Sequence, residues 1–328
     1  MKFLKEERIR PQRIFNSYLN LSIKDTNFFF RKKKKIAFKC PACNKQGKKI
    51  FLKLNFDYDI CNKCNSIYHS PRYKEENFKL FYKNGKSVKY WGSDFYKQTS
   101  KSRVKLLWIP KIKLIKKIIN TKKVKINHLI DIGSGFGDFL NLAKKKICSN
   151  TTGIEPSKIF NKIYLKNKHS IINKNIEDIN TKDLPNNNSK LFTSFELFEH
   201  VYDPNKFVKK IYEIMKKGDI LILSTLSGTG LDISTLGQNS KSINPPHHIN
   251  FLNPYSMKIL FNKHKFKVLD LFTPGKLDID IMQNNIDKIE DLFWKNFILK
   301  STKEEKNKMQ KFLQNNNLSS HMWIVCQK

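Results

Sequence analysis

Three glycines at alternate positions, Gly133, Gly135 and Gly137, follow a short apolar run that contains the acid Asp131. The apolar run reads as a buried strand, and apolar residues with a helical period follow the glycines. Glycine lets the backbone turn sharply and approach a ligand with no side chain between them. The spacing differs from the nicotinamide fingerprint, whose third glycine comes three residues after the second. It predicts a ligand-binding turn between a strand and a helix.

A second acid, Glu155, ends the next predicted strand and lies 20 residues beyond Gly135. In a βαβ unit this position is beside the glycine loop, where a carboxylate accepts hydrogen bonds from both hydroxyls of a ribose. An ordinary surface glutamate after a strand is the alternative interpretation. The coupling of Glu155 to the glycine loop favours the ribose.

Four cysteines form two Cys-x-x-Cys pairs, Cys40 with Cys43 and Cys61 with Cys64, separated by 17 residues. This is the spacing of a zinc ribbon, in which four thiolates surround one tetrahedral Zn²⁺. Two disulfides are the alternative, but a cytosolic chain keeps its thiols reduced. Four cysteines leave no open position for a substrate, so the predicted zinc is structural.

The composition is strongly basic, with 63 Lys and Arg among 328 residues and a formal charge of +35. Such a charge would normally suggest nucleic acid. Only six of these residues are arginine, the usual choice for bidentate phosphate and base contacts, and the lysines are spread over the whole chain. Nucleic acid is therefore not favoured as the partner. No stretch approaches the roughly 20 apolar residues of a membrane span, and no signal peptide is evident, so we expect a cytoplasmic protein.

The order of predicted elements indicates four segments. Strands and helices alternate from residue 128, which is the pattern of a mostly parallel α/β sheet covered by helices on both faces, a Rossmann-like fold. Strands are expected at 129–132, 151–155, 169–172, 191–195, 220–224 and 321–326. The segments are a loosely ordered basic lead-in (1–35), the ribbon (36–72), an aromatic and basic connector (73–127) and the α/β domain (128–328). The connector contains a predicted helix at 103–119 that is interrupted at Pro110. The α/β domain contains a predicted helical insertion at about 278–317.

With these pieces in place, the chain resembles a class I methyltransferase that uses S-adenosylmethionine (SAM). The similarity extends to the bacterial type that carries an N-terminal zinc ribbon and often modifies sugars in surface-polysaccharide pathways. It covers residues 36–328. The matching segments are Asp131 to Gly137, Glu155, Glu196 to Pro204 (similar to a block of ubiquinone-type O-methyltransferases), Lys217 to Asp219, Pro246 to Phe251 and Thr273 to Asp278.

The resemblance implies SAM as the cofactor and a place for each part of it. The backbone of the glycine loop, including Ser134, and the pair Phe195-Glu196 would line the methionine end. Glu155 would bind the ribose, and Asn175 and Ile176 the adenine. Family members often have Asp where this chain has Asn175, so the charge is missing from the adenine contact.

Methyl transfer to a hydroxyl needs a base, and three histidines follow strands at the edge where such folds bind ligands. His200 follows the fourth strand, and His247 and His248 follow the fifth. Imidazole titrates near neutrality, so each can take a proton at physiological pH. We favour His248; the alternative interpretations are that His200 caps or packs the following helix and that the pair His247-His248 fixes its loop. Glu196, Glu199 and His200 are a hypothetical site for a divalent ion.

We expect an enzyme with a small acceptor, a nucleotide-linked sugar. Asn250 and Tyr255 are candidates to bind sugar hydroxyls, and lysines to bind the diphosphate. An RNA or protein methyltransferase that uses the basic surface is the first alternative. A non-catalytic SAM-fold binding module is the second.

Overall fold

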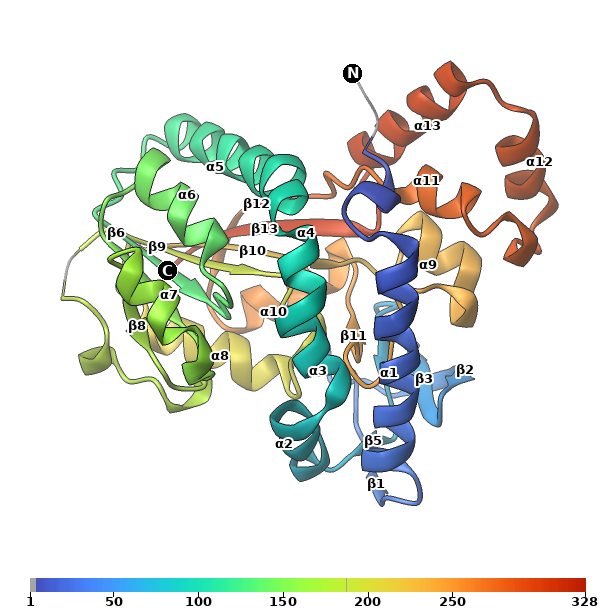
Figure 1. Cartoon of the computed structure of the whole chain (residues 1–328), viewed down its shortest axis with the longest axis horizontal. Coiled ribbons are helices and arrows are strands. Elements are labelled where there is room, and N and C mark those ends of the chain that lie inside the picture. Colours follow the sequence, from blue (N-terminus) through green and yellow to red (C-terminus); the bar gives the residue numbers. More distant parts are fainter. Residues whose placement is uncertain (1–3, 187) are drawn as a thin grey trace.

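The computed structural model describes residues 4–186 and 188–328, and its centre is a seven-stranded sheet in the order β12-β13-β10-β9-β6-β7-β8 (Figure 1). The strands are β6 (His128–Ile132), β7 (Thr151–Ile154), β8 (Ser170–Ile172), β9 (Lys190–Phe195), β10 (Ile220–Leu226), β12 (Lys267–Phe272) and β13 (His321–Gln327). Only β13 runs antiparallel to its neighbours. The predicted fold class is confirmed. The edge strand β12 was not predicted, because its side chains are only partly buried and Lys267 and Asp270 among them are charged.

Helices cover both faces of this sheet because successive strand residues point to opposite sides. Along β10, Ile222 packs with the helices α5 (Ile109–Thr121), α6 (Asp138–Lys146) and α7 (Asn161–Lys166). Its neighbour Leu221 packs with α8 (Pro204–Ile214) and α10 (Pro254–Lys263) on the other face. The two apolar layers hold the strands rigidly, and the loops at their carboxyl ends inherit fixed positions.

The strand order reverses direction between β6 and β9, which are parallel neighbours. In open α/β sheets, ligands bind outside the carboxyl ends of the strands at such a point. The glycine loop follows β6 there, and a 3-10 turn, Phe198–His200, follows β9. Other 3-10 turns are Glu6–Arg8, Lys158–Phe160, Ile176–Asp178, Thr181–Asp183, Gly237–Asn239 and Ile286–Lys288.

The ribbon is part of a second, four-stranded sheet in the order β11-β4-β3-β2. Its strands are β2 (Gly47–Lys53), β3 (Phe56–Cys61), β4 (Ile67–His69) and β11 (Asn250–Phe251), and β1 (Lys35–Ile36) pairs separately with β5 (Arg72–Tyr73). Strand β11 comes from the α/β part of the chain, where Asn250 lies opposite Tyr68. The ribbon is thus joined by backbone hydrogen bonds to the segment that directly follows His248.

The N-terminal segment differs from the expected loosely ordered lead-in. Residues Gln12–Phe30 form the 19-residue helix α1, and Phe15, Tyr18 and Phe30 on it are buried. It packs on α2 (Glu75–Asn84) and α3 (Lys86–Tyr90). The prediction failed because the partners of this helix lie about 60 residues along the chain, and because part of its buried face is polar, at Ser22, Asp25 and Thr26.

The connector is largely helical. After α3 come a π-helical turn (Trp91–Phe95), α4 (Tyr96–Arg103), a second π-helical turn (Val104–Trp108) and α5, in which Pro110 lies in the first turn. Helix α9 (Leu231–Leu236) follows β10, and α11 (Asp278–Gln283), α12 (Leu292–Lys300) and α13 (Lys303–Asn315) form the insertion, which lies at one corner of the molecule (Figure 1). Among the described residues, no helix is both long and apolar enough to cross a membrane.

Candidate functional site

The glycine loop makes a sharp turn from β6 into α6. Gly133, Gly135 and Gly137 all have positive φ values, of 73°, 50° and 74°, and the amide of Gly137 donates to the carbonyl of Ser134 at 2.9 Å. A Cβ at Gly133 would approach Leu197 to 2.8 Å, whereas one at Gly135 would meet nothing within 4 Å. The positive φ therefore favours glycine at each position, and the free space around Gly135 leaves its backbone open to a ligand.

Glu155 reaches the glycine loop as the sequence predicts for its position. Its carboxylate accepts a hydrogen bond from the amide of Gly135 at 3.0 Å and one from the amide of Ser157 at 3.0 Å. Burial raises the pKa of this carboxyl, and the two amides act in the opposite direction. A carboxylate has about four lone-pair positions, so these two amides leave capacity for two ribose hydroxyls.

Asp131 and Ser134 are held from behind the loop by hydroxyl groups. The Thr193 hydroxyl donates to Asp131 at 2.7 Å, and burial raises the pKa of Asp131 to about 7. The buried Tyr164 hydroxyl donates to the Ser134 hydroxyl at 2.5 Å. These side chains fix the conformation of the turn, and the surface that faces a ligand is made by the backbone.

The other predicted cofactor residues lie at two places. The exposed Asn175 donates weakly, at 3.3 Å, to Asp178, next to the buried Ile176. The ring of Phe195 packs on Phe139, with 4.8 Å between centroids, inside the apolar layer. The side chain of Phe195 therefore points into the core, and only its backbone faces the ligand-binding edge.

Glu196 is held by cations that the sequence analysis did not identify. Its Oε1 atom accepts from Lys111 Nζ at 2.8 Å, from Ser224 Oγ at 2.8 Å and from His321 Nε2 at 2.6 Å. Burial alone would raise the pKa of Glu196, but the charges of His321 and Lys111 hold it well below its usual range. The residue also has a φ of 55°, in the left-handed region, which is costly and typical of functional sites.

The structure brings Glu199, His200 and His248 together, and one ligand atom from each lies within 4.8 Å of the others. Burial and the charge of Glu196 raise the pKa of Glu199 to about 8. Its Oε2 accepts from the Thr225 hydroxyl at 2.9 Å. The sequence suggested an ion site of Glu196, Glu199 and His200. In the structure the group that could hold an ion consists of Glu199, His200 and His248, and Glu196 is not part of it.

Hydrogen bonds fix the orientation of both histidine rings in this cluster. His248 Nδ1 lies 2.7 Å from the carbonyl oxygen of Ser242, which can only accept, so this nitrogen carries the proton and Nε2 keeps its lone pair. His200 Nδ1 is 3.2 Å from the hydroxyl of Tyr82. Burial lowers the pKa of His248 to about 4, and burial with the neighbouring histidines lowers that of His200. Both rings are therefore neutral at physiological pH.

His247 has a different environment, and it is only 4% exposed. Its Nε2 lies 2.9 Å from the Ser87 hydroxyl, which in turn donates to Asp25 at 2.6 Å. The Asp25 carboxylate accepts the single Ser87 proton, so His247 donates from Nε2. This chain of bonds connects the histidine to helices α1 and α3, which makes His247 a residue that positions the loop and argues against it as the base.

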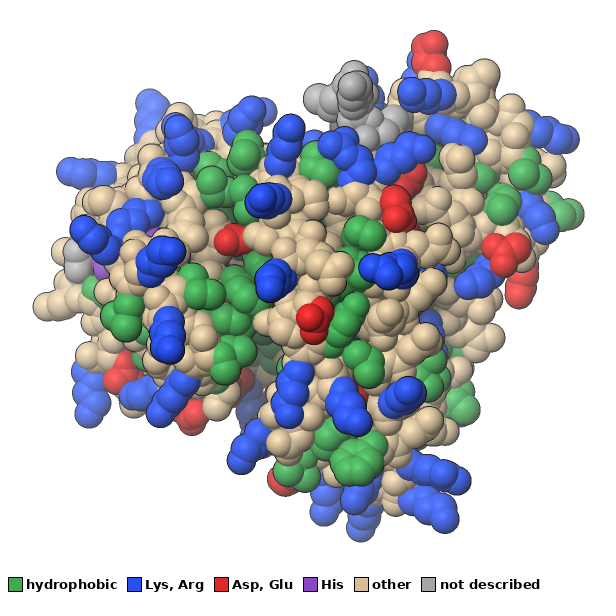
Figure 2. All heavy atoms as spheres, in the orientation of Figure 1, with side chains coloured by type: hydrophobic (Ala, Val, Ile, Leu, Met, Phe, Trp, Pro, Cys, Tyr) green, Lys and Arg blue, Asp and Glu red, His purple; other side chains and the backbone are tan. Residues whose placement is uncertain are grey.

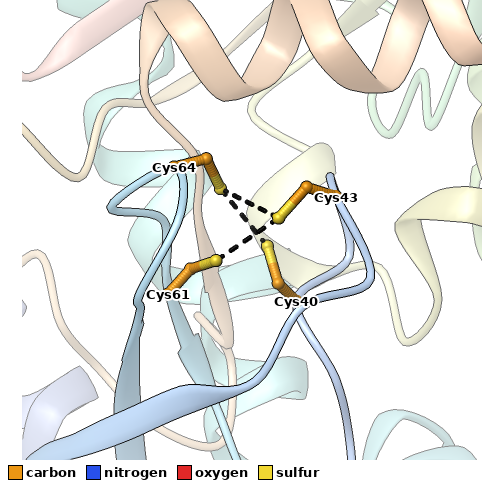
Figure 3. A group of neighbouring side chains, drawn as sticks. All are labelled: Cys40, Cys43, Cys61 and Cys64. Carbon is orange, nitrogen blue, oxygen red and sulfur yellow. Dashed lines mark hydrogen bonds between the residues drawn. The ribbon is translucent and has the colours of Figure 1, made fainter.

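The four predicted zinc ligands converge on one point (Figure 3). The Sγ atoms of Cys40 and Cys64 are 3.4 Å apart, as are those of Cys43 and Cys61, and no cysteine of the chain is in a disulfide. A tetrahedral Zn²⁺ with 2.3 Å bonds needs sulfur atoms about 3.8 Å apart. The donor set and its spacing therefore fit one zinc ion, and the structure pairs none of the four thiols in a disulfide.

The ribbon and the histidine loop (residues 240–248) are bound to one another by side chains as well as by β11. The Tyr58 hydroxyl donates to the carbonyl of His248 at 2.7 Å. Arg72, fully buried, donates to the side chain of Asn250 at 2.9 Å, whose amide donates to the carbonyl of Val201 at 2.6 Å. Asn250 is consequently occupied and buried, so it is not available to bind a sugar hydroxyl as the sequence suggested.

The sequence profile of a methyltransferase domain matches residues 101–271, more than half of the chain and the part that carries the glycine loop, Glu155 and the histidines. The chain belongs to this methyltransferase family. Its sheet and glycine loop are those of the class I, SAM-dependent enzymes. A separate comparison with curated proteins found no match to the chain.

Solved structures of other methyltransferases are similar to this one in fold. One is a putative sarcosine dimethylglycine methyltransferase from Galdieria sulphuraria, 14% identical, covering 67% of this chain and 86% of its own, with a TM-score of 0.45. Another is a SAM-dependent methyltransferase, possible histamine N-methyltransferase, from Thermotoga maritima, 16% identical, covering 76% and 99%, with a TM-score of 0.47. A SAM-dependent methyltransferase from Archaeoglobus fulgidus is 18% identical, covers 66% and 94%, and has a TM-score of 0.42.

Helix α4 of this methyltransferase covers the glycine loop, and its contribution was missed in the sequence. The Tyr96 ring stacks on Phe136 of the loop, with centroids 4.0 Å apart and planes at 3°, and its hydroxyl donates to Asp138 at 2.8 Å. Arg103, two turns further on, is 8% exposed, and its Nε has no hydrogen-bond partner among the described residues. Periodicity could have revealed the helix, but not that it lies against the glycine loop.

Proposed function

We propose that this methyltransferase transfers the methyl group of SAM to a hydroxyl of a small acceptor, a nucleotide-linked sugar of a surface-polysaccharide pathway. The observation that carries the proposal is the neutral, correctly oriented imidazole of His248 beside Glu199 and His200, at the ligand-binding edge of the sheet. The choice of a sugar rests on the resemblance of the ribbon and motif set to that bacterial type. A reducing compartment, the cytoplasm, belongs to the proposal because zinc binding needs four free thiolates.

SAM, when bound, supplies a methyl group that its positively charged sulfur already activates for transfer. The chain must bind this cofactor in one orientation. In the proposal, the backbone of Gly133 to Gly137 borders the methionine end together with Glu196, and Glu155 accepts the ribose hydroxyls. Asn175 and Ile176 border the adenine, and Asp131 and Ser134 support the loop.

Arg103 is the proposed partner of the cofactor's carboxylate. Its guanidinium is buried on the face of α4 that also carries Tyr96 and Ser100, which both bond to Asp138 at the start of α6. Burial lowers the pKa of Arg103, and the nearby charge of Glu196 opposes that effect. An unpaired buried charge costs several kcal/mol, so a ligand carboxylate would supply the missing acceptor. Arg103→Met should weaken S-adenosylhomocysteine but not 5′-methylthioadenosine, which lacks the carboxylate.

His248 is the proposed base. As the acceptor oxygen forms its bond to the methyl carbon, the hydroxyl proton would move to the free Nε2 of His248, while Nδ1 continues to donate to Ser242. The resulting imidazolium would lie beside Glu199, and its positive charge would lower the raised pKa of that carboxyl. His200 has a similar environment and is the alternative base.

A divalent ion held by Glu199, His200 and His248 is a second role for the same cluster. The Nδ1 bond from His248 to a backbone carbonyl is the outer contact that ligating histidines usually make. Such an ion would bind the acceptor hydroxyl and lower its pKa. Turnover that is lost with a chelator and regained with Mg²⁺ or Mn²⁺, at constant zinc content, would assign the cluster to the ion.

The decisive experiment is methyl transfer from labelled SAM, with the purified zinc-loaded protein, to a panel of nucleoside-diphosphate sugars. Label in a sugar nucleotide supports the proposal, and the panel is compared with total RNA and with a cell lysate as acceptors. Label in RNA or protein alone would support the first alternative instead. The Lys and Arg side chains are scattered over the visible face (Figure 2), and a defined track for a polymer is not evident there. Cofactor binding without any transfer would support a binding module.

A further inference from the structure

Two cations, Arg10 and Lys53, have no full counter-charge among the residues that the structure describes. Arg10 lies between the first 3-10 turn and α1, and its side chain is 25% exposed. Its nearest carboxylate, that of Glu6, is 3.9 Å away, at the outer limit of an ion pair, and the Nε atom is buried without a hydrogen-bond partner in the described chain. Glu6 is itself engaged by Asn284 at 3.3 Å. The Arg10 guanidinium therefore keeps unused donors.

Lys53, at the end of the ribbon strand β2, is the second cation. Its Nζ donates to the carbonyl of Ser240 at 2.7 Å, and no ion pair of Lys53 occurs among the residues that the structure describes. Burial lowers the pKa of Lys53 to about 8, and the like charge of Lys288 adds to this. A partly buried ammonium beside another cation is unfavourable unless an anion joins them.

Both cations lie around the loop that carries the proposed base. Lys53 bonds to Ser240 of this loop, and His248 bonds to Ser242, two residues on. Arg10 lies over the ring of Phe15, with 5.5 Å to its centroid. Aromatic contacts continue from Phe15 through Tyr18 to His247, at 6.0 and 5.2 Å between centroids.

We propose that the methyl acceptor carries a phosphate or diphosphate group, and that Arg10 and Lys53 bind it beside His248. The inference rests on the proposed function, because it assigns the space around His248 to the acceptor. A guanidinium binds two phosphate oxygens at once, and a lysine adds a point charge. The two cations come from the N-terminal segment and the ribbon, so the parts of the chain outside the α/β domain would determine which acceptor binds.

Calorimetric titration of the full-length, zinc-loaded protein with sodium pyrophosphate, in magnesium-free buffer and with saturating S-adenosylhomocysteine, tests the inference. Pyrophosphate should bind at one site per chain. Arg10→Met and Lys53→Met should each weaken it by about ten- to a hundredfold, the effect of removing one charged hydrogen-bond donor. Inorganic phosphate in place of pyrophosphate distinguishes a single phosphate from a diphosphate as the preferred group.

The matched controls remove the same charge nearby. Arg13→Met and Lys48→Met change exposed residues, three positions after Arg10 and on the same strand as Lys53, and should leave pyrophosphate binding nearly unchanged. Equal losses in controls and site variants would mean non-specific attraction to the basic chain and would overturn the inference, as would the absence of pyrophosphate binding. The inference would also be overturned if binding of a twelve-nucleotide single-stranded RNA depended on Arg10 and Lys53 while binding of pyrophosphate did not.

Cofactor binding separates the two possible failures. Each variant is also titrated with S-adenosylhomocysteine, which should bind as it does to the wild type, because neither cation contacts the glycine loop. If the wild type binds S-adenosylhomocysteine but not pyrophosphate, only the phosphate site is wrong. If the wild type does not bind S-adenosylhomocysteine, the proposed function itself is wrong.

Discussion

The glycine loop and the histidine loop lie at the same edge of the sheet but are built in different ways. The glycine loop takes its shape from residues that are close in sequence, such as Gly135 and Glu155, 20 positions apart. The histidine loop is held by residues far from it in sequence. The hydrogen bond from Tyr58 to His248 spans 190 positions. The hydrogen bond between Ser87 and His247 spans 160 positions.

This difference indicates how the two halves of the reaction are specified. A cofactor that is the same for many enzymes is bound by a local motif, which can be transferred between chains as a unit. The acceptor side is assembled from the N-terminal helix, the ribbon and the loop after β10, so changes in any of these alter it. We infer that the ribbon supports the binding of the acceptor and not that of the cofactor. Removing the zinc of the ribbon is the strongest test of this difference between the two loops.

The double substitution Cys61→Ser with Cys64→Ser should have the largest effect. Structural zinc contributes roughly 10–16 kcal/mol of apparent binding free energy in small zinc modules, and Asn253, just after β11, donates to the carbonyl of Cys64 at 2.7 Å. Loss of the metal should therefore release β11 and the histidine loop. Metal analysis should show about one zinc per wild-type chain and none in the variant, and pyrophosphate binding should disappear.

The cofactor side provides the control for zinc loss. S-adenosylhomocysteine should still bind to the zinc-free variant within a few-fold of the wild-type affinity, since no hydrogen bond joins the ribbon to the glycine loop among the described residues. Cys148→Ser, at a buried cysteine outside the ribbon, should keep its zinc. If cofactor affinity falls as steeply as pyrophosphate affinity, the two regions are not independent and the comparison is wrong.

His248→Ala should lower turnover of the acceptor by about 10²–10⁴-fold, the usual contribution of a general base. S-adenosylhomocysteine affinity should stay near the wild-type value, because the imidazole is directed at Glu199 and His200 and not at the glycine loop. The pair of results, measured by initial rates and by calorimetry, separates acceptor chemistry from cofactor binding.

The control for the base is His264→Ala, at a partly exposed histidine on α10's C-terminal side whose ring contacts Asn205. It should leave turnover unchanged. Full turnover by His248→Ala would remove His248 from its role, and the same measurement on His200→Ala would then test the alternative base.

The sequence allowed prediction of those features whose signal is local. The strand β6, the turn at Gly133 to Gly137 and the position of Glu155 follow from spacing within one βαβ unit. The two Cys-x-x-Cys pairs likewise predicted a cluster that the structure forms. The residue roles at the cofactor site stay predictions, because geometry alone does not show what binds there.

The parts that could not be predicted depend on contacts between distant segments. Nothing local to Lys111 or His321 indicates that both will bond to Glu196, 85 and 125 positions away. Helix α1 was missed for a related reason, since it is stabilised by aromatic residues of α2 to α4. His247 was a candidate base by its neighbours in sequence, and only its bond to Ser87 shows that its nitrogen is already used.

Glu155→Ala tests the local side of the comparison and should weaken S-adenosylhomocysteine by about ten- to a hundredfold. Two ribose hydroxyls lose a charged acceptor, at roughly 1.5–3 kcal/mol, and the Gly135 amide loses its partner as well. Glu76→Ala, at an exposed glutamate on α2, should have no effect. An unchanged affinity in Glu155→Ala, measured by calorimetry, would refute the ribose assignment, and pyrophosphate binding should be the same in all three proteins.

A dependence of stability on pH is expected where the two regions meet, at Glu196 and Glu199. Burial raises the pKa of Glu199 in the folded protein to about 8, whereas the same carboxyl in the unfolded chain has a pKa of about 4.5. Between these two pH values the folded protein keeps the carboxyl proton and the unfolded chain has released it. Stability from Glu199 is thus present below pH 4.5 and is lost as pH rises to 8, at no more than roughly 1.4 kcal/mol per pH unit. Glu199→Gln should remove this loss, so its free energy of unfolding, measured with urea, should rise relative to wild type from pH 5 to 8.

Glu196→Gln should show the opposite dependence, although it changes a residue only three positions away. The charges of His321 and Lys111 lower the pKa of Glu196, so its stabilising contribution is present above the unfolded pKa of about 4.5 and is lost as the pH falls below that value. The variant should therefore be less stable than wild type at pH 7, and the deficit should shrink toward pH 4. If the free energy of unfolding changed with pH in the same direction in both variants, one electrostatic environment would govern both carboxyls. Opposite profiles would show that Glu196 belongs to the ion-paired cofactor side and Glu199 to the neutral histidine side, where a proton must be taken up and released.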